Sequence, residues 1–284
     1  MSVLEGLKKI IPPSDLYHYT TQTGLSGILS DDMLWASKIH YLNDSTEFNL
    51  ALCLAEEVLH KKLGADTLQK DKIKCLINNI KTIEKLNVCV ASLSTRRDQL
   101  SQWRAYSGST GGFAVWLNSE SLKQQAEQQG FYLVKCIYSE EEQKTLIAAL
   151  IDECLAEDFN VVPGYTDSSG RMFVALATGG DFAKKLAIIA PALKNISFEE
   201  ESEWRLVSRT GINVQELSFR TGVSTLTPYY KFKLGEKSSY LKGITVGPTP
   251  NLELAANAAQ MLLAKYNAGR YCTAYKTEIP FRNW

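Results

Sequence analysis

Residues 16–20 read Leu-Tyr-His-Tyr-Thr, and residues 34–37 read Leu-Trp-Ala-Ser. Apolar residues within 23–29 recur at helical spacing between these two runs. Because alternate residues of a strand point to opposite faces, His18 and Thr20 present two hydrogen-bonding side chains about 7 Å apart on one face. Taken alone, His18 is more simply explained by a local structural hydrogen bond than by a ligand. The stretch predicts a strand, a short helix and a second strand.

The remaining pattern predicts an α+β fold. Strands are expected at 88–92, 112–117, 132–138, 203–208, 229–233, 243–246 and 271–279, and helices at 46–63, 71–84, 141–159, 173–189 and after Asn251. In the last helix the buried side is expected to hold Leu254, Ala258, Met261, Leu262 and Tyr266. The strands cluster, and neither a repeat nor a low-complexity linker divides the chain. We therefore predict a single domain over residues 1–284, with a helical insertion at approximately 139–195.

Composition excludes several classes of protein. The 284 residues are 45% hydrophobic, and 31 basic side chains balance 31 acidic ones, so no global field attracts nucleic acid. The six cysteines are dispersed without C-x-x-C spacing and there are three histidines, which argues against zinc and against a disulfide framework. No segment approaches the roughly 20 apolar residues that span a bilayer. We expect a cytoplasmic protein that binds neither a metal nor a membrane.

Charge is nevertheless uneven along the chain. Residues 61–104 contain ten basic and four acidic side chains, a balance of 10 − 4 = +6, whereas residues 139–158 contain seven acidic side chains and one lysine. Two solvated helix faces explain these runs more simply than a site for a polyanion does. The basic stretch is a secondary indication of nucleic-acid binding.

A second polar constellation occupies residues 199–207, which read Glu-Glu-Glu-Ser-Glu-Trp-Arg-Leu-Val. Strand geometry places Glu201, Glu203 and Arg205 on one face. Taken alone, the segment is an exposed edge strand with a salt-bridged rim. Its chemical interpretation depends on the N-terminal stretch.

The His-x-Thr strand, the apolar helix and the second strand that ends in Ser37 together resemble the NAD-binding opening of the ADP-ribosyltransferases. The resemblance implies that His18 hydrogen-bonds the adenosine ribose and that the backbone at Tyr19 and Thr20 holds the nicotinamide amide. Tyr41 is then the candidate to stack on the nicotinamide ring, whose positive charge suits an aromatic face. Tyr41 is equally explained as a core or rim aromatic. NAD would be a substrate, and no metal is implied.

Glu-x-Glu resembles the catalytic element of the same superfamily. The resemblance implies that Glu203 contacts the nicotinamide ribose and stabilises positive charge as the glycosidic bond breaks. Glu201 would orient the nucleophile, and Arg205 would hold the carboxylates in place and ionised. The implied fold is ADP-ribosyltransferase-like, a split and strongly bent β core with NAD between its halves and helices outside.

A wider resemblance covers nearly the entire chain. The motifs His-Tyr-Thr, Tyr-Leu-Asn-Asp-Ser-x-Glu, Gln-Trp-Arg-Ala-Tyr-Ser, Glu-x-Glu-Trp-Arg and Ile-Pro-Phe-Arg are similar to those of a bacterial and phage family known as domain of unknown function 2971. This pattern adds the candidate site residues Asn43, Asp44, Glu47, Trp103, Arg104 and Tyr106. Asn43 and Asp44 equally suit a helix cap, the two aromatic residues equally suit a core, and Arg104 fits a pyrophosphate or a structural carboxylate.

We therefore expect an NAD-dependent ADP-ribosyltransferase that modifies a macromolecule. Nucleic acid is slightly favoured over protein as the acceptor, because of the basic stretch. The bacterial and phage family implies a toxin or antiphage effector, with an antitoxin or inhibitor protein as a partner. The alternatives are an NAD glycohydrolase and a non-catalytic module that binds a nucleotide or a nucleic acid.

Overall fold

The computed structural model describes residues 2–42, 46–65, 69–106, 111–157, 165–166, 172–173, 180–222 and 225–281. The strands are β1 Asp15–Thr21, β2 Met33–Lys38, β3 Cys89–Ser94, β4 Gly112–Asn118, β5 Phe131–Lys135, β6 Tyr165–Thr166, β7 Met172–Phe173, β8 Glu203–Ser208, β9 Ser218–Thr221, β10 Leu226–Lys233, β11 Leu241–Val246 and β12 Thr273–Lys276. The α-helices are α1 Val3–Lys8, α2 Gln22–Asp31, α3 Thr46–Ala65, α4 Lys70–Ile80, α5 Leu100–Tyr106, α6 Ser119–Gln129, α7 Glu140–Ala156, α8 Gly180–Ile189, α9 Lys237–Tyr240 and α10 Leu252–Lys265. Short 3-10 helices are η1 Ile39–Tyr41, η2 Ile83–Lys85, η3 Ala190–Ala192, η4 Ile196–Glu201 and η5 Val214–Glu216.

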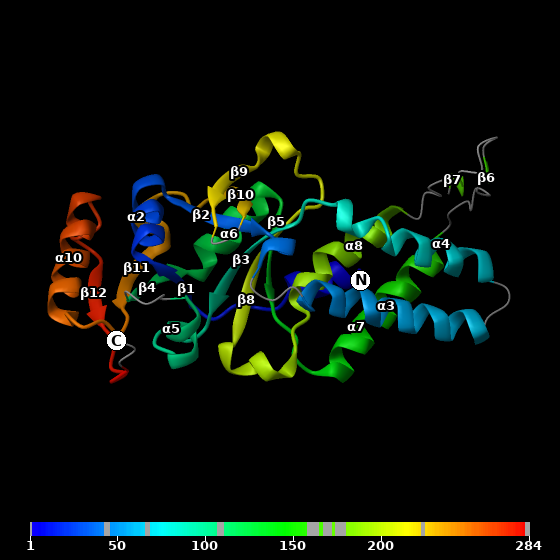
Figure 1. The fold of residues 1–284 in the computed structure, drawn as a ribbon, viewed down its shortest axis with the longest axis horizontal. Helices are drawn as coiled ribbons and strands as arrows, with labels where there is room; N and C mark the ends of the chain where they lie inside the picture. The colour runs from blue at the N-terminus through cyan, green and yellow to red at the C-terminus, as the bar shows by residue number, and fades with distance from the viewer. Residues whose placement is uncertain are drawn as a thin grey trace.

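Ten strands form one mixed sheet, which divides at β3 (Figure 1). The order along the main path is β12-β11-β4-β1-β3-β2-β10-β9, and β8 pairs with β3 and β5. One edge of β3 pairs with β8 over Val90 to Ser94. On the opposite edge Ser94 pairs with β1, whereas Cys89 and Val90 pair with β2. β1 and β2 therefore leave β3 at different ends, and a fork lies between them.

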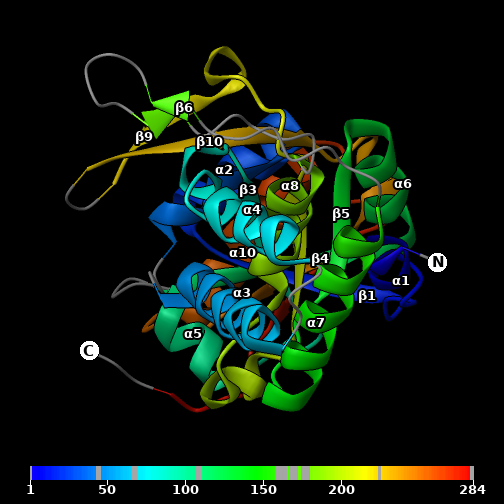
Figure 2. The ribbon, with the colours of Figure 1, turned by 90° about the vertical axis from the view of Figure 1, so that its right-hand side faces the viewer.

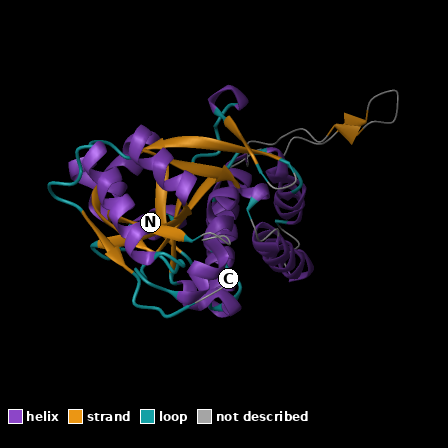
Figure 3. Cartoon of the chain, turned by 60° about the vertical axis from the view of Figure 1, so that its left-hand side comes forward, coloured by secondary structure: helices purple, strands orange, loops and turns teal. Residues whose placement is uncertain are grey.

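Helices cover both faces of the central strands (Figures 1 and 2). On one face α2, α6, α9 and α10 pack against alternate strand residues such as Ala91 and Leu206. On the other face α1, α3, α4, α7 and α8 pack against Val90, Val134 and Val207. All six residues of β8 are buried as a result. The layering appears clearly when strands and helices are coloured separately (Figure 3).

The α+β prediction is confirmed, and most expected strands and helices form near their expected positions. The helices α5, α6 and α9 and the strands β6, β7 and β9 were not expected from the sequence. Helices α7 and α8, within the expected insertion, pack in one cluster with α3 and α4. Among the helices of the described ranges, none combines the length and hydropathy that a bilayer crossing requires.

The expected buried face of α10 is only partly correct: Leu262 and Tyr266 pack against the core, whereas Leu254, Ala258 and Met261 are exposed. Leu254 is 69% exposed and Met261 74% exposed, whereas Ala256, Ala259 and Leu263 are buried. The helix contacts β11 and β12 through this narrower face. Small side chains let a helix approach a sheet closely, so residue size rather than hydrophobicity alone decides which face is buried.

Candidate functional site

A cleft of about 980 Å³ lies at the fork of the sheet. Its lining comes from β1, α2, β2, η1, β3, α5, η4, β8 and β9, so segments far apart in the chain meet there. Aromatic side chains such as Trp35 and Phe198 line it together with polar and charged ones. The volume is at the upper end of the range of about 300–1,000 Å³ found for small-molecule and cofactor sites.

His18 connects β1 to β3 at this fork. Its Nδ1 lies 2.9 Å from the carbonyl oxygen of Ser92, between the residues of β3 that pair with β1 and β2. Because a carbonyl only accepts, Nδ1 carries the proton of this hydrogen bond. Burial lowers the pKa of His18 and the Arg220 guanidinium lowers it further, although the hydrogen bond to Ser92 opposes both. The ring is neutral, so Nε2 is an acceptor, and no group of the described residues donates to it.

Thr20 lies in close contact with Gly24 at the start of α2. A Cβ on Gly24 would lie 2.0 Å from Thr20 Oγ1. The Gly24 N–H donates to Thr21 Oγ1 at 3.3 Å, which caps α2. The glycine therefore lets α2 begin directly behind the Thr20 side chain.

Arg220 and Ser37 bring β9 and β2 together at the cleft. Arg220 Nη2 donates to Ser37 Oγ at 3.0 Å, and its guanidinium carbon lies 6.0 Å from the centre of the Trp35 ring. Trp35 also packs on Tyr229, at 4.7 Å between ring centres. Within the described ranges no carboxylate pairs with Arg220. Its planar guanidinium is suited to an anionic group of a ligand.

Four charged side chains meet in the wall of the cleft. Lys194 Nζ lies 2.6 Å from Glu203 Oε2 and also contacts Glu201 Oε2. Arg205 binds Glu203 through Nε, 2.8 Å from Oε1, and through Nη2, 3.0 Å from Oε2. The side chains of Lys194 and Glu203 are 4% exposed, that of Arg205 is 3% exposed and that of Glu201 is 12% exposed. Charges buried this deeply persist in folded proteins only when they are paired, as they are here.

The two carboxyl groups have opposite pKa shifts. Burial opposes ionisation of Glu203, but Arg205 and Lys194 outweigh it and hold the pKa of Glu203 at about 2. Burial raises the pKa of Glu201 above its usual 4.5, and the hydrogen bond from Lys194 only partly offsets this. Carboxyl groups whose environments separate their pKa values in this way are suited to different roles in acid–base chemistry.

Glu201 reaches this cluster from a 3-10 helix rather than from a strand. η4 ends at Glu201, Ser202 has a left-handed backbone with φ 45°, and β8 begins at Glu203. The turn at Ser202 brings both glutamates to Lys194, at a cost of roughly 1–2 kcal/mol for a residue with a Cβ. The alternative of an exposed edge strand is wrong, because β8 is buried between β3 and β5. The expected strand face holds Glu203 and Arg205 but not Glu201, which precedes the strand.

Two tyrosines adjoin the glutamates. The Glu203 N–H donates to Tyr138 Oη at 2.8 Å. Tyr106 lines the cleft, and burial, reinforced by the negative charges of Glu203 and Glu201, raises its pKa to about 12. Its hydroxyl is therefore protonated at neutral pH and can donate a hydrogen bond into the cleft.

Tyr19 and Trp103 hold the segment that leads into α5. Tyr19 Oη donates to the Arg96 carbonyl at 2.7 Å and accepts from the Gln99 N–H at 3.1 Å. The two rings pack edge to face with centres 4.6 Å apart, and Trp103 Nε1 donates to Asp98 Oδ1 at 2.6 Å. The side chain of Tyr19 is thus used in the fold, so a part in ligand binding falls to its backbone.

Most of the site residues expected from the sequence line the cleft: His18, Tyr19, Thr20, Ser37, Tyr41, Tyr106, Glu201, Glu203 and Arg205. Trp103 is buried behind it, and Arg104 does not line it. The Arg104 guanidinium instead lies 5.0 Å from the centre of the Phe281 ring, so it is not placed to bind a pyrophosphate in the cleft. Asn43, Asp44 and the side chain of Glu47 lie outside the described residues. In the described ranges no three His, Cys, Asp or Glu side chains are grouped as a metal site.

Sequence reasoning missed Lys194, Arg220 and Phe198, which all line the cleft. Lys194 precedes Glu201 by seven residues in a segment without strand or helix periodicity, so no spacing pattern connects them. Arg220 lies on β9, a strand of four residues, which is too short for a clear alternation of apolar and polar residues.

The lysines of α4, within the basic stretch, do not line the cleft. Lys72 Nζ donates to the carbonyl of Leu155, in the last turn of α7, and to that of Glu157, just after the helix, and Lys62 pairs with Asp152 at 2.7 Å. The basic stretch and the acidic stretch therefore meet in part and neutralise one another.

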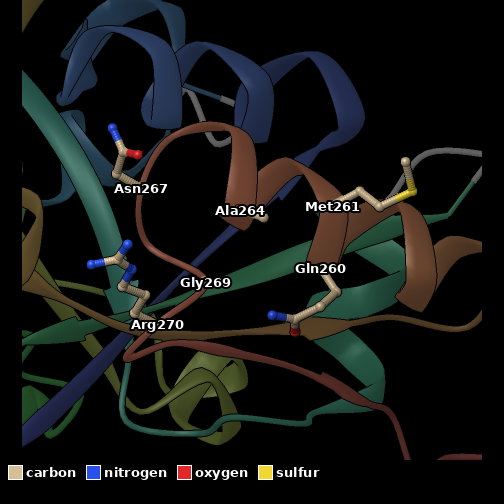
Figure 4. A pocket seen from close by; sticks show the side chains of 6 residues that line it. All are labelled: Gln260, Met261, Ala264, Asn267, Gly269 and Arg270. Carbon is tan, nitrogen blue, oxygen red and sulfur yellow. The ribbon is translucent and has the colours of Figure 1, made fainter.

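A second hollow of about 490 Å³ lies at the end of α10 (Figure 4). It is lined by Gln260, Met261, Ala264, Asn267, Gly269 and Arg270. Gln260 already accepts the Ala274 N–H at 2.9 Å, and Arg270 is the one charged residue in this lining. The hollow lacks the paired titratable groups of the cleft, so the cleft is the candidate active site.

Comparison with known families covers the part of the chain that holds the charged cluster. Residues 102–206 match the family described as "Protein of unknown function (DUF2971)". That range of the chain is similar to DUF2971. It extends from α5 to β8 and includes Lys194, Glu201 and Glu203, whereas His18 lies outside it. No curated protein and no solved structure matches the chain.

Proposed function

We propose that this protein cleaves the nicotinamide–ribose bond of NAD and transfers ADP-ribose to a macromolecule. The observation that carries the proposal is the pair Glu201 and Glu203, held by Lys194 and Arg205 in a cleft of about 980 Å³ that His18 also lines. A carboxylate positioned where positive charge develops is the electrostatic aid that glycosidic bond cleavage needs.

The residues of the cleft suit different parts of NAD. His18 Nε2 accepts a hydrogen bond from a ribose hydroxyl, because the neutral ring has its other nitrogen committed to Ser92. Tyr41, 42% exposed in the lining, offers an aromatic face to the cationic nicotinamide ring. Arg220, instead of Arg104, binds the diphosphate of NAD in this proposal.

The divided sheet supports the finer fold assignment, an ADP-ribosyltransferase-like split and bent β core. β1 and β2 leave opposite ends of β3, and the cleft lies between them. His18 on β1, Ser37 on β2 and Glu203 on β8 all line this cleft. NAD would bind between the two halves, as the resemblance implies.

The acceptor is proposed to be a nucleic acid, with protein as the alternative. The lysines of α4 do not line the cleft, and Arg220, which does line it, is assigned to the diphosphate of NAD. The choice of a nucleic acid therefore rests on the basic balance of residues 61–104 alone. The resemblance to a bacterial and phage family adds the proposal of a toxin or antiphage effector that an antitoxin or inhibitor protein controls.

Two other functions compete with transfer. A glycohydrolase would use water as acceptor in the same cleft. A non-catalytic nucleotide-binding module is favoured by one specific observation, namely that both oxygens of Glu203 are already bound by cations.

Incubation with NAD labelled in the adenosine part tests these proposals. Purified protein is mixed with separated protein, RNA and DNA fractions of a cell lysate, and released nicotinamide is measured in parallel. Label in a nucleic-acid fraction supports the proposal, label in protein changes the acceptor, and nicotinamide release without label indicates a glycohydrolase. If no mixture releases nicotinamide but calorimetry detects NAD binding, only the non-catalytic binding module remains. If calorimetry detects no NAD binding either, every proposed use of NAD is refuted.

A salt series on the transfer reaction tests the route of a nucleic acid. When basic side chains of a protein neutralise the phosphates of a nucleic acid, the affinity for that nucleic acid falls steeply as the salt concentration rises. We expect the double variant Lys70→Gln and Lys74→Gln, on the exposed face of α4, to leave that slope unchanged, because these lysines do not line the cleft. A flat salt dependence of the unsubstituted protein would contradict a nucleic-acid acceptor.

A further inference from the structure

The two glutamates differ in how much of each carboxylate is free for a substrate. Arg205 Nε binds Oε1 of Glu203, and Arg205 Nη2 and Lys194 Nζ both bind its Oε2. Oε2 of Glu201 accepts a hydrogen bond from Lys194 Nζ, and no group of the described residues donates a hydrogen bond to its Oε1. Glu201 is also the more exposed of the two, at 12% against 4% for the side chains. One glutamate is thus enclosed by cations and the other has an oxygen available in the cleft.

We propose that Glu201 is the reacting carboxylate of this site and that Lys194 is the residue that positions it, with Glu203 as a buried anchor for Lys194 and Arg205. This assignment rests on the proposed cleavage of NAD. It reverses the order expected from the Glu-x-Glu motif, in which Glu203 contacts the ribose.

The backbone of Lys194 is held firmly enough to serve this purpose. Its N–H donates to the Ile137 carbonyl at 3.1 Å, and its carbonyl accepts from Gln143 Nε2 at 2.8 Å. Its ammonium lies 4.9 Å from the centre of the Phe198 ring, within the range of a cation–π contact. Lys194 is therefore tied to the segment after β5, to α7 and to η4 at once, and its contact with Glu201 Oε2 sets the direction of that carboxylate.

The enclosed anion of Glu203 is poorly suited to the reaction. Two cations in contact with it already balance its charge, so it offers little further stabilisation to an oxocarbenium ion. Glu201 shares one of those cations and retains an oxygen that a substrate can approach. The two glutamates thus differ in their contacts and in how far their charge is already balanced, and this difference is the same for every acceptor.

The reaction balances with Glu201 as a base. The bond between C1′ of the ribose and the nicotinamide nitrogen breaks, and its electron pair stays with nicotinamide, which leaves neutral. The ionised Glu201 stabilises the ribosyl cation through its available oxygen. An acceptor hydroxyl or ring nitrogen then forms a bond to C1′ and gives up its proton to the Glu201 carboxylate, which later releases it to water.

Glu201 lies among charged and titratable groups from several elements: Lys194 before η4, Glu203 and Arg205 on β8, Tyr106 on α5 and Tyr138 after β5. Glu203 and burial favour the protonated form of Glu201, whereas Lys194 and Arg205 favour the ionised form. Loss of Lys194 should raise the pKa of Glu201, and loss of the Glu203 charge should lower it. The acidic limb of a pH profile would follow Glu201 in each case.

Four variants test the assignment: Glu201→Gln, Glu203→Gln, Lys194→Met and Lys194→Arg. Glu201→Gln should bind NAD with unchanged affinity and melting temperature but lose at least about a hundredfold in nicotinamide release. Glu203→Gln should lose stability, yet its folded fraction should turn over within about tenfold of the unsubstituted protein. Glu200→Gln, the same change at an exposed position of η4, is the matched control and should match the unsubstituted protein.

Lys194 is tested by pH profile and by titration of the free protein. Lys194→Met should move the acidic limb of nicotinamide release to higher pH, and Lys194→Arg should restore it. Carbon-13 NMR of labelled glutamate carboxyls, without NAD, should show the same rise in the pKa of Glu201 in Lys194→Met. Turnover by Glu201→Gln within about threefold of normal, together with a hundredfold loss in folded Glu203→Gln, would overturn the assignment. If the unsubstituted protein releases no nicotinamide, both the proposed function and the catalytic role of Glu201 are refuted. The positioning role of Lys194 is refuted separately if the pKa of Glu201 in the NMR titration is the same in Lys194→Met as in the unsubstituted protein.

Discussion

His18 Nδ1 and the Ser92 carbonyl oxygen lie 2.9 Å apart at the point where β1 and β2 diverge from β3. The fork leaves this carbonyl without a neighbouring strand on that edge, and the His18 side chain takes the place of the missing backbone donor. One hydrogen bond therefore satisfies the backbone and orients the imidazole in the cleft, so structure and binding depend on the same residue.

His18→Ala should reduce both stability and NAD affinity. Loss of the donor leaves the Ser92 carbonyl unsatisfied, which costs about 1–3 kcal/mol, and loss of Nε2 removes an acceptor for the ribose. Because the pKa of His18 is lowered in the folded protein, its contribution to stability is present above pH 6.5 and is lost as pH falls through the lowered value. Thermal melting and calorimetry measure the two effects, with His60→Ala on the exposed face of α3 as control. A lower melting temperature with unchanged NAD affinity would identify His18 as purely structural.

Glu203→Gln should reveal how much of the acid stability depends on the buried cluster. The pKa of Glu203 is held at about 2, below its usual 4.5, so its ionised form contributes about 3 kcal/mol to stability above pH 4.5. That contribution is lost as pH falls from 4.5 through about 2. Urea unfolding at a series of pH values should show a smaller decrease below pH 4.5 for the variant than for the unsubstituted protein. Parallel stability curves of the two proteins would contradict this account.

Gly24→Ala should disturb the cleft from behind. The new Cβ would lie 2.0 Å from Thr20 Oγ1, so the threonine or the start of α2 must move. We expect a loss of roughly 1–3 kcal/mol in stability, by analogy with overpacked cores, together with weaker NAD binding. Gly64→Ala is the matched control, since no atom lies within 4 Å of its Cβ and alanine in a helix gains about 0.5–1 kcal/mol over glycine. Equal behaviour of the two variants would show that the Thr20 contact is unimportant.

Asp98→Ala should release the C-terminal segment from α5. Asp98 accepts from Trp103 Nε1 at 2.6 Å, from Thr277 Oγ1 at 2.7 Å and from the Glu278 N–H at 2.8 Å. We expect faster amide hydrogen exchange in residues 96–106 and 273–281, because three donors lose a charged acceptor, each such bond being worth about 1.5–3 kcal/mol. Glu253→Ala removes an exposed ion pair with Lys276 and should change stability by no more than about 1 kcal/mol. Unchanged exchange in both segments would show that the tail is held by other contacts.

Local pattern was sufficient for much of the site. The strand that carries His18, the helix after it and the strand that ends near Ser37 form where their periodicity indicates. Glu203 and Arg205 share a face because β8 is a strand with period two. In α10, by contrast, hydrophobicity alone misplaced Leu254 and Met261 on the buried face, since close approach to the sheet selected alanines instead.

The amino-acid sequence by itself determined the α+β class, most strand positions and most of the polar residues that line the cleft, because these follow from periodicity and turn chemistry within short segments. Only the tertiary structure decided that the sheet divides at β3, that β8 is central instead of an edge, and that Lys194 lies between Glu201 and Glu203. It also placed Arg104 against Phe281 and Arg220 in the cleft. The reason is physical: pairing between distant strands and the neutralisation of buried charge depend on which segments pack together, and neither leaves a regular spacing in the chain.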